Sequence, residues 1–367
     1  MVVTASDASW RPQGAVRIVA RDIWRRDAIG NFCFQIADLL RAAGVEAVLY
    51  AENFSPDEDI RPLADVFTQT APADILFYHF SIEDPAFEAL SQLACARILY
   101  FHGITPARFF TDSDPHTEGL VSRGLNQRPL ARHFDVLMAN SRTTAACLIE
   151  GMGPEAPAVE QVLACPPVLG QNRWQNIVAE PADVPQSPRL LLYVGRLSPH
   201  KGVDDLLEIF AHLARLDPDV HLAIVGGGSA EQLARLADIA SGAGVAERVT
   251  FLQNVTDGVI KALYERCDGL ISCSQHEGFC VPIADAMLLD RPVFCRPDPA
   301  MLEVAGDAAV ILPDGQDAQA KARLIADTLA DTARLSALAA SRQARRAALA
   351  PGLEGAIIWQ ALRQAQP

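Results

Sequence analysis

Two carboxylates stand close together in a stretch of the sequence that glycine and proline punctuate. Residues 272–287 read S-C-S-Q-H-E-G-F-C-V-P-I-A-D-A-M, with Glu277 before a Gly-Phe pair and Asp285 eight residues later. Pro282 suits the first turn of a helix, whose free N–H groups attract an anion. A carboxylate accepts paired hydrogen bonds from sugar hydroxyls. The spacing therefore indicates a site for a phosphorylated sugar ligand, although Asp285 alone also suits an aspartate that stabilises a helix dipole.

A second group of charged residues lies in a different part of the chain. Residues 193–202 read Y-V-G-R-L-S-P-H-K-G directly after an apolar run, so Gly195 ends a predicted strand and Arg196 and Lys201 follow in a loop. Lys201 is one of only three lysines in the sequence. Two cations at the carboxyl edge of a parallel sheet suit a diphosphate, whereas the alternative is an ordinary loop with exposed charges.

A glycine-rich turn follows the next apolar run. Residues 225–229 read V-G-G-G-S, which lacks the complete G-x-G-x-x-G pattern and does not stand at the first strand-to-helix turn of its series. This position disfavours a nicotinamide dinucleotide site. We interpret the stretch as a tight turn that leaves room beside the predicted diphosphate site.

Composition restricts the classes of partner. The 367 residues have 45 acidic and 31 basic side chains, for a net charge of -14, which argues against DNA or RNA because nucleic-acid binding depends on clustered Lys and Arg. The amino terminus does not resemble a signal peptide, and no apolar run approaches the roughly 20 residues that span a bilayer, so we expect a cytoplasmic protein. The eight cysteines are scattered without a C-x-x-C pair, which predicts reduced core thiols rather than disulfides or a zinc site.

Apolar, β-branched runs alternate with stretches of helical spacing in two series. Runs this apolar suit strands that are covered on both faces, which predicts parallel sheets with helices on each side. The predicted strands are 15–20, 46–50, 74–80, 96–102 and 135–141 in the first series, and 189–195, 221–226, 248–252, 269–274 and 292–295 in the second. The predicted helices of the second series are 202–215, 229–242, 256–266 and 282–289.

A proline-rich stretch without periodicity, 165–188, separates the two series and is typical of an interdomain linker. We therefore predict an α/β fold with a first domain over 1–170, a second over 171–350 and a closing segment over 351–367 that contains an amphipathic helix at 353–365. Two doubly wound, Rossmann-like domains whose strand carboxyl ends face each other leave a cleft for a ligand.

The pairing of G-R-L-x-x-x-K-G with E-G-F-x-x-P-x-x-[ED]-A-M resembles the retaining glycosyltransferases of family 4, which have the GT-B fold. The resemblance covers essentially the whole chain and implies that the final helix returns to the first domain. It implies that Glu277 contacts hydroxyls of the transferred sugar, that Asp285, one methylene shorter than the usual Glu, contacts the nucleotide ribose, and that Arg196 and Lys201 neutralise the leaving diphosphate. The implied donor-binding residues also include Gly195, Asn254 and Val255 near the base, and the turn Gly278, Phe279, Cys280 and Val281.

The first domain carries two further resemblances. R-R-D-A-I-G-N-F at 25–32 resembles the family's glycine-rich acceptor loop, of which Gly30 carries over. Y-F-H-G-I-T-P-A-R-F-F at 100–110 is similar to bacterial mannosyltransferases that build O-antigens and exopolysaccharides, and places His102 beside the transferred sugar; a lone histidine can also be structural.

The resemblance implies a hexosyltransferase that uses a nucleotide-sugar donor, with GDP-mannose as first expectation and a UDP-hexose as second, and a saccharide or lipid-linked saccharide as acceptor. We expect no cofactor and no metal requirement. Trp24, Arg25 and Arg26 suggest either weak peripheral contact with the inner membrane or an ordinary surface loop. Two alternatives are an inactive homologue that binds nucleotide-sugar, and an epimerase or phosphorylase of the same architecture.

Overall fold

The computed structural model describes residues 10–25, 27–111, 113–170 and 172–366. The chain divides into two compact units, Met1–Gly170 with Leu349–Pro367, and Gln171–Ala348. The first unit therefore combines the beginning and the end of the chain, and the long helix α12 (Thr332–Leu353) contributes residues to both units.

The first unit contains a seven-stranded sheet in the order β3-β2-β1-β4-β5-β6-β7, and every neighbouring pair in it is parallel. Side chains on alternate residues of a strand point to opposite faces, so the buried residues of β1 feed two separate cores. The strands are β1 (Val16–Ile23), β2 (Ala47–Phe54), β3 (Ile60–Pro62), β4 (Ile75–Phe80), β5 (Ala96–Phe101), β6 (Val136–Ala139) and β7 (Leu163–Ala164).

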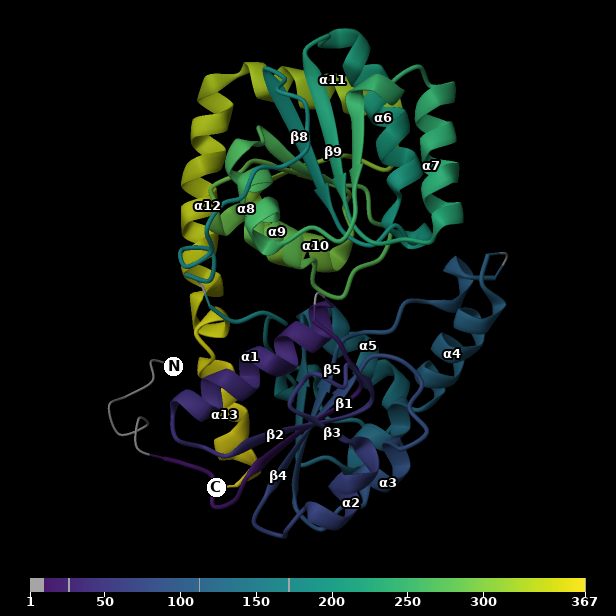
Figure 1. The fold of residues 1–367 in the computed structure, drawn as a ribbon. Helices are drawn as coiled ribbons and strands as arrows, with labels where there is room; N and C mark the ends of the chain where they lie inside the picture. Colours follow the sequence, from purple (N-terminus) through teal and green to yellow (C-terminus); the bar gives the residue numbers. More distant parts are fainter. Residues whose placement is uncertain (1–9, 26, 112, 171, 367) are drawn as a thin grey trace. The chain divides into compact units, whose positions relative to one another are not determined.

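Helices cover both faces of this sheet (Figure 1). On one face, α1 (Ala28–Ala42) and the final helix α13 (Ala356–Ala365) bury Phe32, Ile36 and Leu362 against the strands, and α13 contacts β5, β6 and β7. The other face is covered by α3 (Phe87–Ser91), α4 (Pro115–Asn126) and α5 (Arg142–Met152), with α2 (Val66–Gln69) near its edge. Helix α13 begins after Gly355, whose φ of 79° suits glycine.

The second unit contains a six-stranded, all-parallel sheet in the order β10-β9-β8-β11-β12-β13. The strands are β8 (Arg189–Val194), β9 (Val220–Val225), β10 (Val249–Leu252), β11 (Gly269–Ser272), β12 (Val293–Cys295) and β13 (Ala309–Ile311). Its other helices are α6 (Val203–Leu216), α7 (Ala230–Gly242), α8 (Asp257–Arg266), α9 (Val281–Leu288), α10 (Pro299–Ala305) and α11 (Ala318–Ala330) (Figure 1).

The predicted α/β class with two Rossmann-like parallel sheets is confirmed, and the predicted strands match the observed ones within a few residues at each end. The expected cleft between the domains stays a prediction. Several elements were not predicted from the sequence: the short strands β3, β7 and β13, and the helices α2, α4, α5, α10, α11 and the 22-residue α12. The stretch interpreted as a linker is packed rather than loose, because Lys261 and Arg266 of α8 donate hydrogen bonds to the carbonyl groups of Ile177 and Val184.

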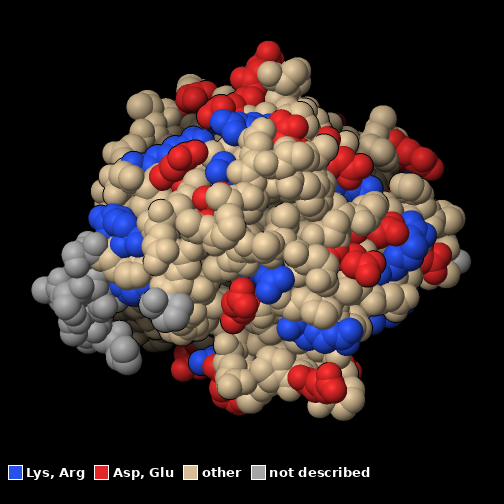
Figure 2. Space-filling model, turned by 90° about the horizontal axis from the view of Figure 1, so that it is seen from below, with Lys and Arg blue, Asp and Glu red and all other residues tan. Residues whose placement is uncertain are grey.

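Acidic and basic side chains are interspersed on the face of the molecule that Figure 2 shows, and its described residues form no large field of one sign. No helix among the described residues has both the length and the apolar character that a membrane crossing requires.

Candidate functional site

The order of strands in the second unit marks one edge of the sheet as a ligand position. The strand order reverses between β8 and β11, and ligands of doubly wound sheets bind beyond the carboxyl ends of the strands at such a point. The loop after β8 carries Arg196 and Lys201, and the loop after β11 carries Glu277. The two charged groups that were predicted from separate stretches therefore come from the two strands at the switch point.

Lys201, Glu277 and Ser274 form what we call the acid–lysine cluster. Lys201 Nζ donates a hydrogen bond to Glu277 Oε1 at 2.9 Å, and Ser274 Oγ donates to the same oxygen at 2.7 Å. The two charged side chains are only 17% and 11% exposed. Because both loops are partly buried, the pair holds its geometry better than a surface ion pair does.

The backbone ties these two loops together. The amide of Gln275 donates to the carbonyl of His200 at 2.7 Å, so the residues beside Lys201 and Glu277 are linked directly. Gly202 has a φ of 63°, and a Cβ on it would lie 2.3 Å from the carbonyl oxygen of Cys273. Glycine is therefore required where the loop after β8 meets the loop after β11.

The side chain of Arg196 is exposed, and its backbone is held by a hydrogen bond from Tyr193. The Tyr193 hydroxyl donates to the Arg196 carbonyl at 2.9 Å. Burial, with Glu277 nearby, holds the pKa of Tyr193 well above its ordinary value, so the phenol stays a neutral donor. Gly195 lies against the glycine-rich turn, where a Cβ on Gly226 would meet the Gly195 carbonyl oxygen at 1.7 Å. The turn thus permits close packing of two backbones, in line with the interpretation of 225–229 as a tight turn.

The turn from Gly278 to Val281 leads into α9. Phe279 and Cys280 are buried, and Cys280 has a φ of 73°, which is unusual for a residue with a side chain. Helix α9 begins at Val281 with Pro282 in its first turn, as predicted. Backbone strain of this kind often occurs where a turn must point its N–H groups in a particular direction.

Asp298 supports Glu277 from the next loop. Its carboxylate caps α10 by accepting hydrogen bonds from the amides of Ala300 and Met301 at 3.0 and 3.1 Å. The backbone amide of Glu277 also interacts with it. Burial raises the pKa of Asp298 above its ordinary value, and these amide donors oppose that shift.

Asp285 lies apart from the acid–lysine cluster in its bonding. Its carboxylate forms an ion pair with Arg173, and its Oδ1 accepts a hydrogen bond from Trp174 Nε1 at 3.1 Å. The side chain is only 9% exposed and belongs to the second turn of α9. The structure therefore brings Lys201 and Glu277 together, while Asp285 has separate partners.

The remaining residues predicted near the donor lie in the loop between β10 and α8. Asn254 is exposed and has a φ of 53°, and Val255 is partly buried beside it. Asparagine tolerates this left-handed conformation better than most residues. Gln253 Nε2 donates to the carbonyl of Gly228 at 3.1 Å, which joins this loop to the glycine-rich turn.

In the first unit, His102 follows β5 and contacts a second histidine, which was not predicted as a site residue. His79, near the end of β4, lies with its Nδ1 2.9 Å from His102 Nε2, and both side chains are buried. A signal was present, because two neighbouring predicted strands, 74–80 and 96–102, each end near a histidine. Asn140 Nδ2 donates to the His102 carbonyl at 2.7 Å and holds its backbone.

The loop before α1 packs against a glycine of that helix and carries an arginine that forms an ion pair. A Cβ on Gly30 would lie 2.1 Å from the carbonyl oxygen of Trp24, so this glycine allows α1 to pack on the loop. Trp24 is 43% exposed. Arg25 forms two hydrogen bonds with Glu58 and stacks on Phe34, which leaves it less available to an anionic surface. Arg26 lies outside the described residues.

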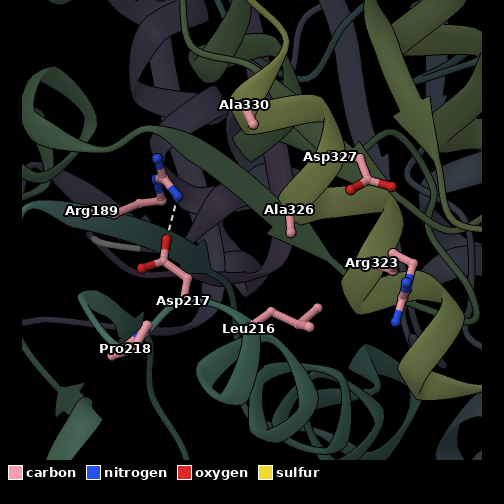
Figure 3. A pocket seen from close by; sticks show the side chains of 8 residues that line it. All are labelled: Arg189, Leu216, Asp217, Pro218, Arg323, Ala326, Asp327 and Ala330. Atoms are coloured by element: carbon pink, nitrogen blue, oxygen red, sulfur yellow. Dashed lines mark hydrogen bonds and ion pairs between the residues drawn. The ribbon is translucent and has the colours of Figure 1, made fainter.

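The second unit also has a hollow of about 370 Å³ at the side of its sheet where the amino ends of the strands lie (Figure 3). It lies where β8 begins and α6 ends, and Arg189 and Asp217 form an ion pair across it. This edge is opposite the one that bears Lys201 and Glu277, so we do not assign the hollow to the candidate site. The lining residues are Arg189, Leu216, Asp217, Pro218, Arg323, Ala326, Asp327 and Ala330.

Among the described residues, no group of three or more His, Cys, Asp or Glu side chains is arranged to hold a metal ion. The eight cysteines are free thiols, and Cys95 and Cys147 are the two that are not fully buried.

Comparison with known proteins decides the character of the second unit. Residues 176–347, just under half of the chain, match the model of the family "Glycosyl transferases group 1". The second unit is a glycosyl transferases group 1 domain. The matched residues almost coincide with Gln171–Ala348 and include Arg196, Lys201 and Glu277.

Relatives of the chain extend this likeness beyond the one domain. The D-inositol 3-phosphate glycosyltransferases of Salinispora tropica and Rhodococcus jostii are 29% and 27% identical to it over 61% and 65% of this chain. The chain spans about half the length of these curated relatives, 50% and 54%.

Solved structures show the same fold over nearly the whole chain. WaaG, a glycosyltransferase involved in lipopolysaccharide biosynthesis, is 15% identical with a TM-score of 0.69, covering 93% of this chain and 98% of that one. Anabaena HepE in complex with UDP-glucose is 19% identical with a TM-score of 0.69, covering 94% and 98%. The group 1 domain and its partner unit thus have the GT-B class of fold.

Proposed function

We propose that the chain is a retaining, nucleotide-sugar-dependent hexosyltransferase. The observation that carries this proposal is the acid–lysine cluster, which lies beside Arg196 at the switch point of a glycosyl transferases group 1 domain. Two cations suit a diphosphate, and a buried carboxylate suits sugar hydroxyls. We assign Arg196 and Lys201 to the diphosphate and Glu277 to the transferred sugar.

The proposed chemistry depends on charge that develops as the donor breaks. When the bond between the sugar and the nucleotide lengthens, negative charge grows on the leaving diphosphate. Cations and N–H groups that are already in position stabilise that charge more strongly in the transition state than in the bound donor, which accelerates the reaction. Arg196, Lys201 and the amides from Gly278 to Val281 are the groups that we assign to this role.

Binding of a donor would redistribute the hydrogen bonds of the cluster. In the structure Lys201 and Ser274 both donate to one oxygen of Glu277, which leaves its other oxygen available for a sugar hydroxyl. Lys201 has three donors and can bind Glu277 and a phosphate oxygen together. The departing phosphate is our candidate for the base that accepts the proton of the acceptor hydroxyl, and transfer then occurs on the same face of the sugar with retention of configuration.

The identity of the donor is the finer part of the proposal. The 100–110 stretch favours GDP-mannose, and the complex of HepE with UDP-glucose supports a UDP-hexose instead. For the acceptor we propose a saccharide or lipid-linked saccharide used in surface polysaccharide synthesis, which the involvement of WaaG in lipopolysaccharide biosynthesis supports. The curated relatives are named D-inositol 3-phosphate glycosyltransferases, so an inositol phosphate is the alternative acceptor, to be tested beside the saccharides.

A panel of nucleotides tests the donor site. Thermal unfolding would be followed with GDP, UDP and ADP and their common sugar conjugates, on wild type, Lys201→Ala and the control Arg235→Ala, whose arginine forms an exposed ion pair with Asp204. A ligand at 100 times its Kd stabilises the folded state by about 2.7 kcal/mol. We expect one nucleotide to raise Tm in wild type and control but not in Lys201→Ala. No rise with any nucleotide at millimolar concentration would overturn the proposal.

Product analysis separates the remaining alternatives. Donor binding without transfer to any saccharide or inositol phosphate would indicate a homologue that binds nucleotide-sugar without activity. Conversion of the donor in the absence of an acceptor would indicate an epimerase. Formation of a glycoside with the anomeric configuration of the donor is the outcome that we expect.

A further inference from the structure

We propose that His79 is a positioning residue that fixes the tautomer of His102, so that His102 acts as a neutral hydrogen-bond donor through Nδ1. The proposed contact of His102 with a ligand rests on the proposed function, whereas the tautomer itself can be tested without any substrate. The geometry behind it consists of one contact between two buried imidazoles and one buried nitrogen without a partner.

The contact joins two neighbouring strands. His79 is the penultimate residue of β4 and His102 directly follows β5, where the His102 amide donates to the Phe80 carbonyl at 2.9 Å. His79 Nδ1 and His102 Nε2 are 2.9 Å apart, so one nitrogen donates a hydrogen and the other accepts it. The hydrogen bond that one ring nitrogen makes decides which nitrogen of the partner ring carries the proton.

The other nitrogen of His79 decides the direction of this bond. His79 Nε2 is buried and has no hydrogen-bond partner among the described residues. A buried N–H without an acceptor is rarer in proteins than an acceptor without a donor. We therefore place the His79 proton on Nδ1, from which it donates to His102 Nε2. His102 must then carry its own proton on Nδ1.

The surroundings keep both rings neutral. Phe32 meets the two rings edge-on, with ring centres 5.7 Å from His79 and 6.3 Å from His102, and Phe77 and Tyr100 pack on them from the sheet. Burial lowers the pKa of His79 to about 3 and moves the pKa of His102 well below its ordinary value, with His79 adding to the shift. No charged side chain among the described residues opposes these shifts.

A neutral His102 with its proton on Nδ1 has a restricted chemical role. It can donate one hydrogen bond to a hydroxyl or phosphate oxygen of a ligand, and it does not serve as a cation or a proton carrier near pH 7. Nδ1 is the atom available for this, since Nε2 is occupied by His79 and the backbone is held by Asn140. His79 thus acts on the ligand only through His102.

The tautomer can be measured directly. Proton–nitrogen correlation spectra of protein labelled in its eight histidines distinguish a protonated ring nitrogen from an unprotonated one, and His102→Asn identifies the His102 signals. In wild type we expect His102 with the proton on Nδ1 at pH 7 and at pH 8, because burial keeps its pKa well below the ordinary value. A His102 that is protonated on Nε2, or on both nitrogens at pH 7, would refute the proposal.

Two substitutions of His79 provide a matched pair. His79→Leu removes the donor and should return His102 to a mixture of tautomers, whereas His79→Asn keeps an N–H near the position of Nδ1 and should retain the wild-type spectrum. We expect His79→Leu to lower kcat/KM about tenfold and His79→Asn to restore most of it. An unchanged His102 spectrum in His79→Leu would show that another group sets the tautomer.

Nucleotide binding serves as the folding check and separates the two proposals. The group 1 domain carries the nucleotide residues, so both variants should keep the Tm rise with the wild-type nucleotide. If no nucleotide binds wild type, the proposed function fails while the spectrum of His102 still decides the tautomer. If nucleotide binds and the spectrum shows the Nε2 form, the function stands and the inference about His79 fails.

Discussion

Lys201 and Glu277, 76 residues apart in the chain, meet with a separation of 2.9 Å between Nζ and Oε1. Each follows a different strand, and the two strands are those at which the order of the sheet reverses. The pair is neutral as a unit, so two charges can remain in a partly buried site without a ligand. A diphosphate would add its negative charge to a site already supplied with Lys201 and the exposed Arg196.

Loss of either cation should reduce turnover more than it reduces stability. We expect Arg196→Ala and Lys201→Ala each to lower kcat on the order of 10², because each removes a group that stabilises charge on the leaving diphosphate. Arg235→Ala should keep kcat within a factor of two, since its ion pair with Asp204 is exposed and belongs to α6 and α7. Steady-state kinetics measure all three. An Arg196→Ala enzyme with wild-type kcat would remove that residue from the proposed role.

Removal of divalent metal should leave the reaction largely intact. The proposed neutralisation of the diphosphate uses Arg196 and Lys201, so transfer in excess EDTA should proceed at a rate similar to that in Mg²⁺. The comparison is made on protein dialysed against chelator. A drop of tenfold or more that Mg²⁺ reverses would contradict metal independence.

Asp285 should contribute to stability through its bond to Arg173. Asp285→Ala leaves a mostly buried guanidinium without its partner, and we expect the free energy of unfolding to fall by about 3 kcal/mol. Asp204→Ala breaks an exposed pair and should cost less than about 1 kcal/mol. Urea denaturation provides both values.

The same experiment distinguishes the two roles of Asp285. Replacing both partners, in Arg173→Met with Asp285→Leu, should recover much of the lost stability because no unpaired charge remains. If Asp285→Ala leaves the free energy of unfolding unchanged and instead raises KM for the donor, contact with the ribose is its main role and the bond to Arg173 is incidental.

The glycine-rich turn offers a test of backbone packing. In Gly226→Ala the new methyl would overlap the Gly195 carbonyl oxygen, so the loop that bears Arg196 must shift. We expect a loss of stability of about 1–3 kcal/mol and weaker nucleotide binding. Gly242→Ala, where no atom lies within 4 Å of the new methyl, should be neutral or stabilising by up to about 1 kcal/mol. Equal Tm values for the two variants would contradict this interpretation of the turn.

Buried neutral histidines should make the fold sensitive to mild acid. Burial lowers the pKa of His79 and His200 to about 3, from 6.5. Between these values the unfolded chain binds protons that the folded chain does not, so stability is present above pH 6.5 and is lost as pH falls toward 3. Each such histidine adds a slope of up to about 1.4 kcal/mol per pH unit.

Urea denaturation at pH 5, 6 and 7 measures this slope. His79→Leu should reduce it by about the contribution of one histidine near pH 5. His116→Gln changes a side chain that is exposed in the folded protein and should leave the slope close to wild type. An identical slope in His79→Leu would mean that His79 binds as many protons in the folded protein as in the unfolded chain, which would contradict the lowered pKa.

Most strands were predictable because they depend on local pattern, and apolar runs buried on both faces predicted β8, β9 and β11. The types and spacing of charged residues singled out Lys201 and Glu277, which the structure brings into contact, while their role in a donor site stays a prediction. Helix α12 was not predicted. Most of its side chains are exposed, so the sequence has no apolar stripe at helical spacing there, and Pro351 usually marks a helix end rather than a position inside a helix.

The partners of Asp285 could not be predicted from the sequence. Arg173 and Trp174 lie in an aperiodic stretch more than 100 residues earlier, and only the packing of that stretch in the second unit brings them to α9. His79 is a different case. Its position near the end of the predicted strand next to the one before His102 could be read from the sequence. It was not chosen as a site residue because a single buried histidine is more often structural.

The return of the last helix has a consequence for synthesis. Ile358 and Leu362 of α13 belong to the same core as Phe32 and Ile36, so the first unit cannot complete that core until α13 has left the ribosome. At about 5–20 residues per second, the nearly 200 intervening residues impose a delay of roughly 10 to 40 seconds. During that interval the sheet formed first exposes an apolar face, and the second unit, whose own residues run from 171 to 348, can finish folding before it.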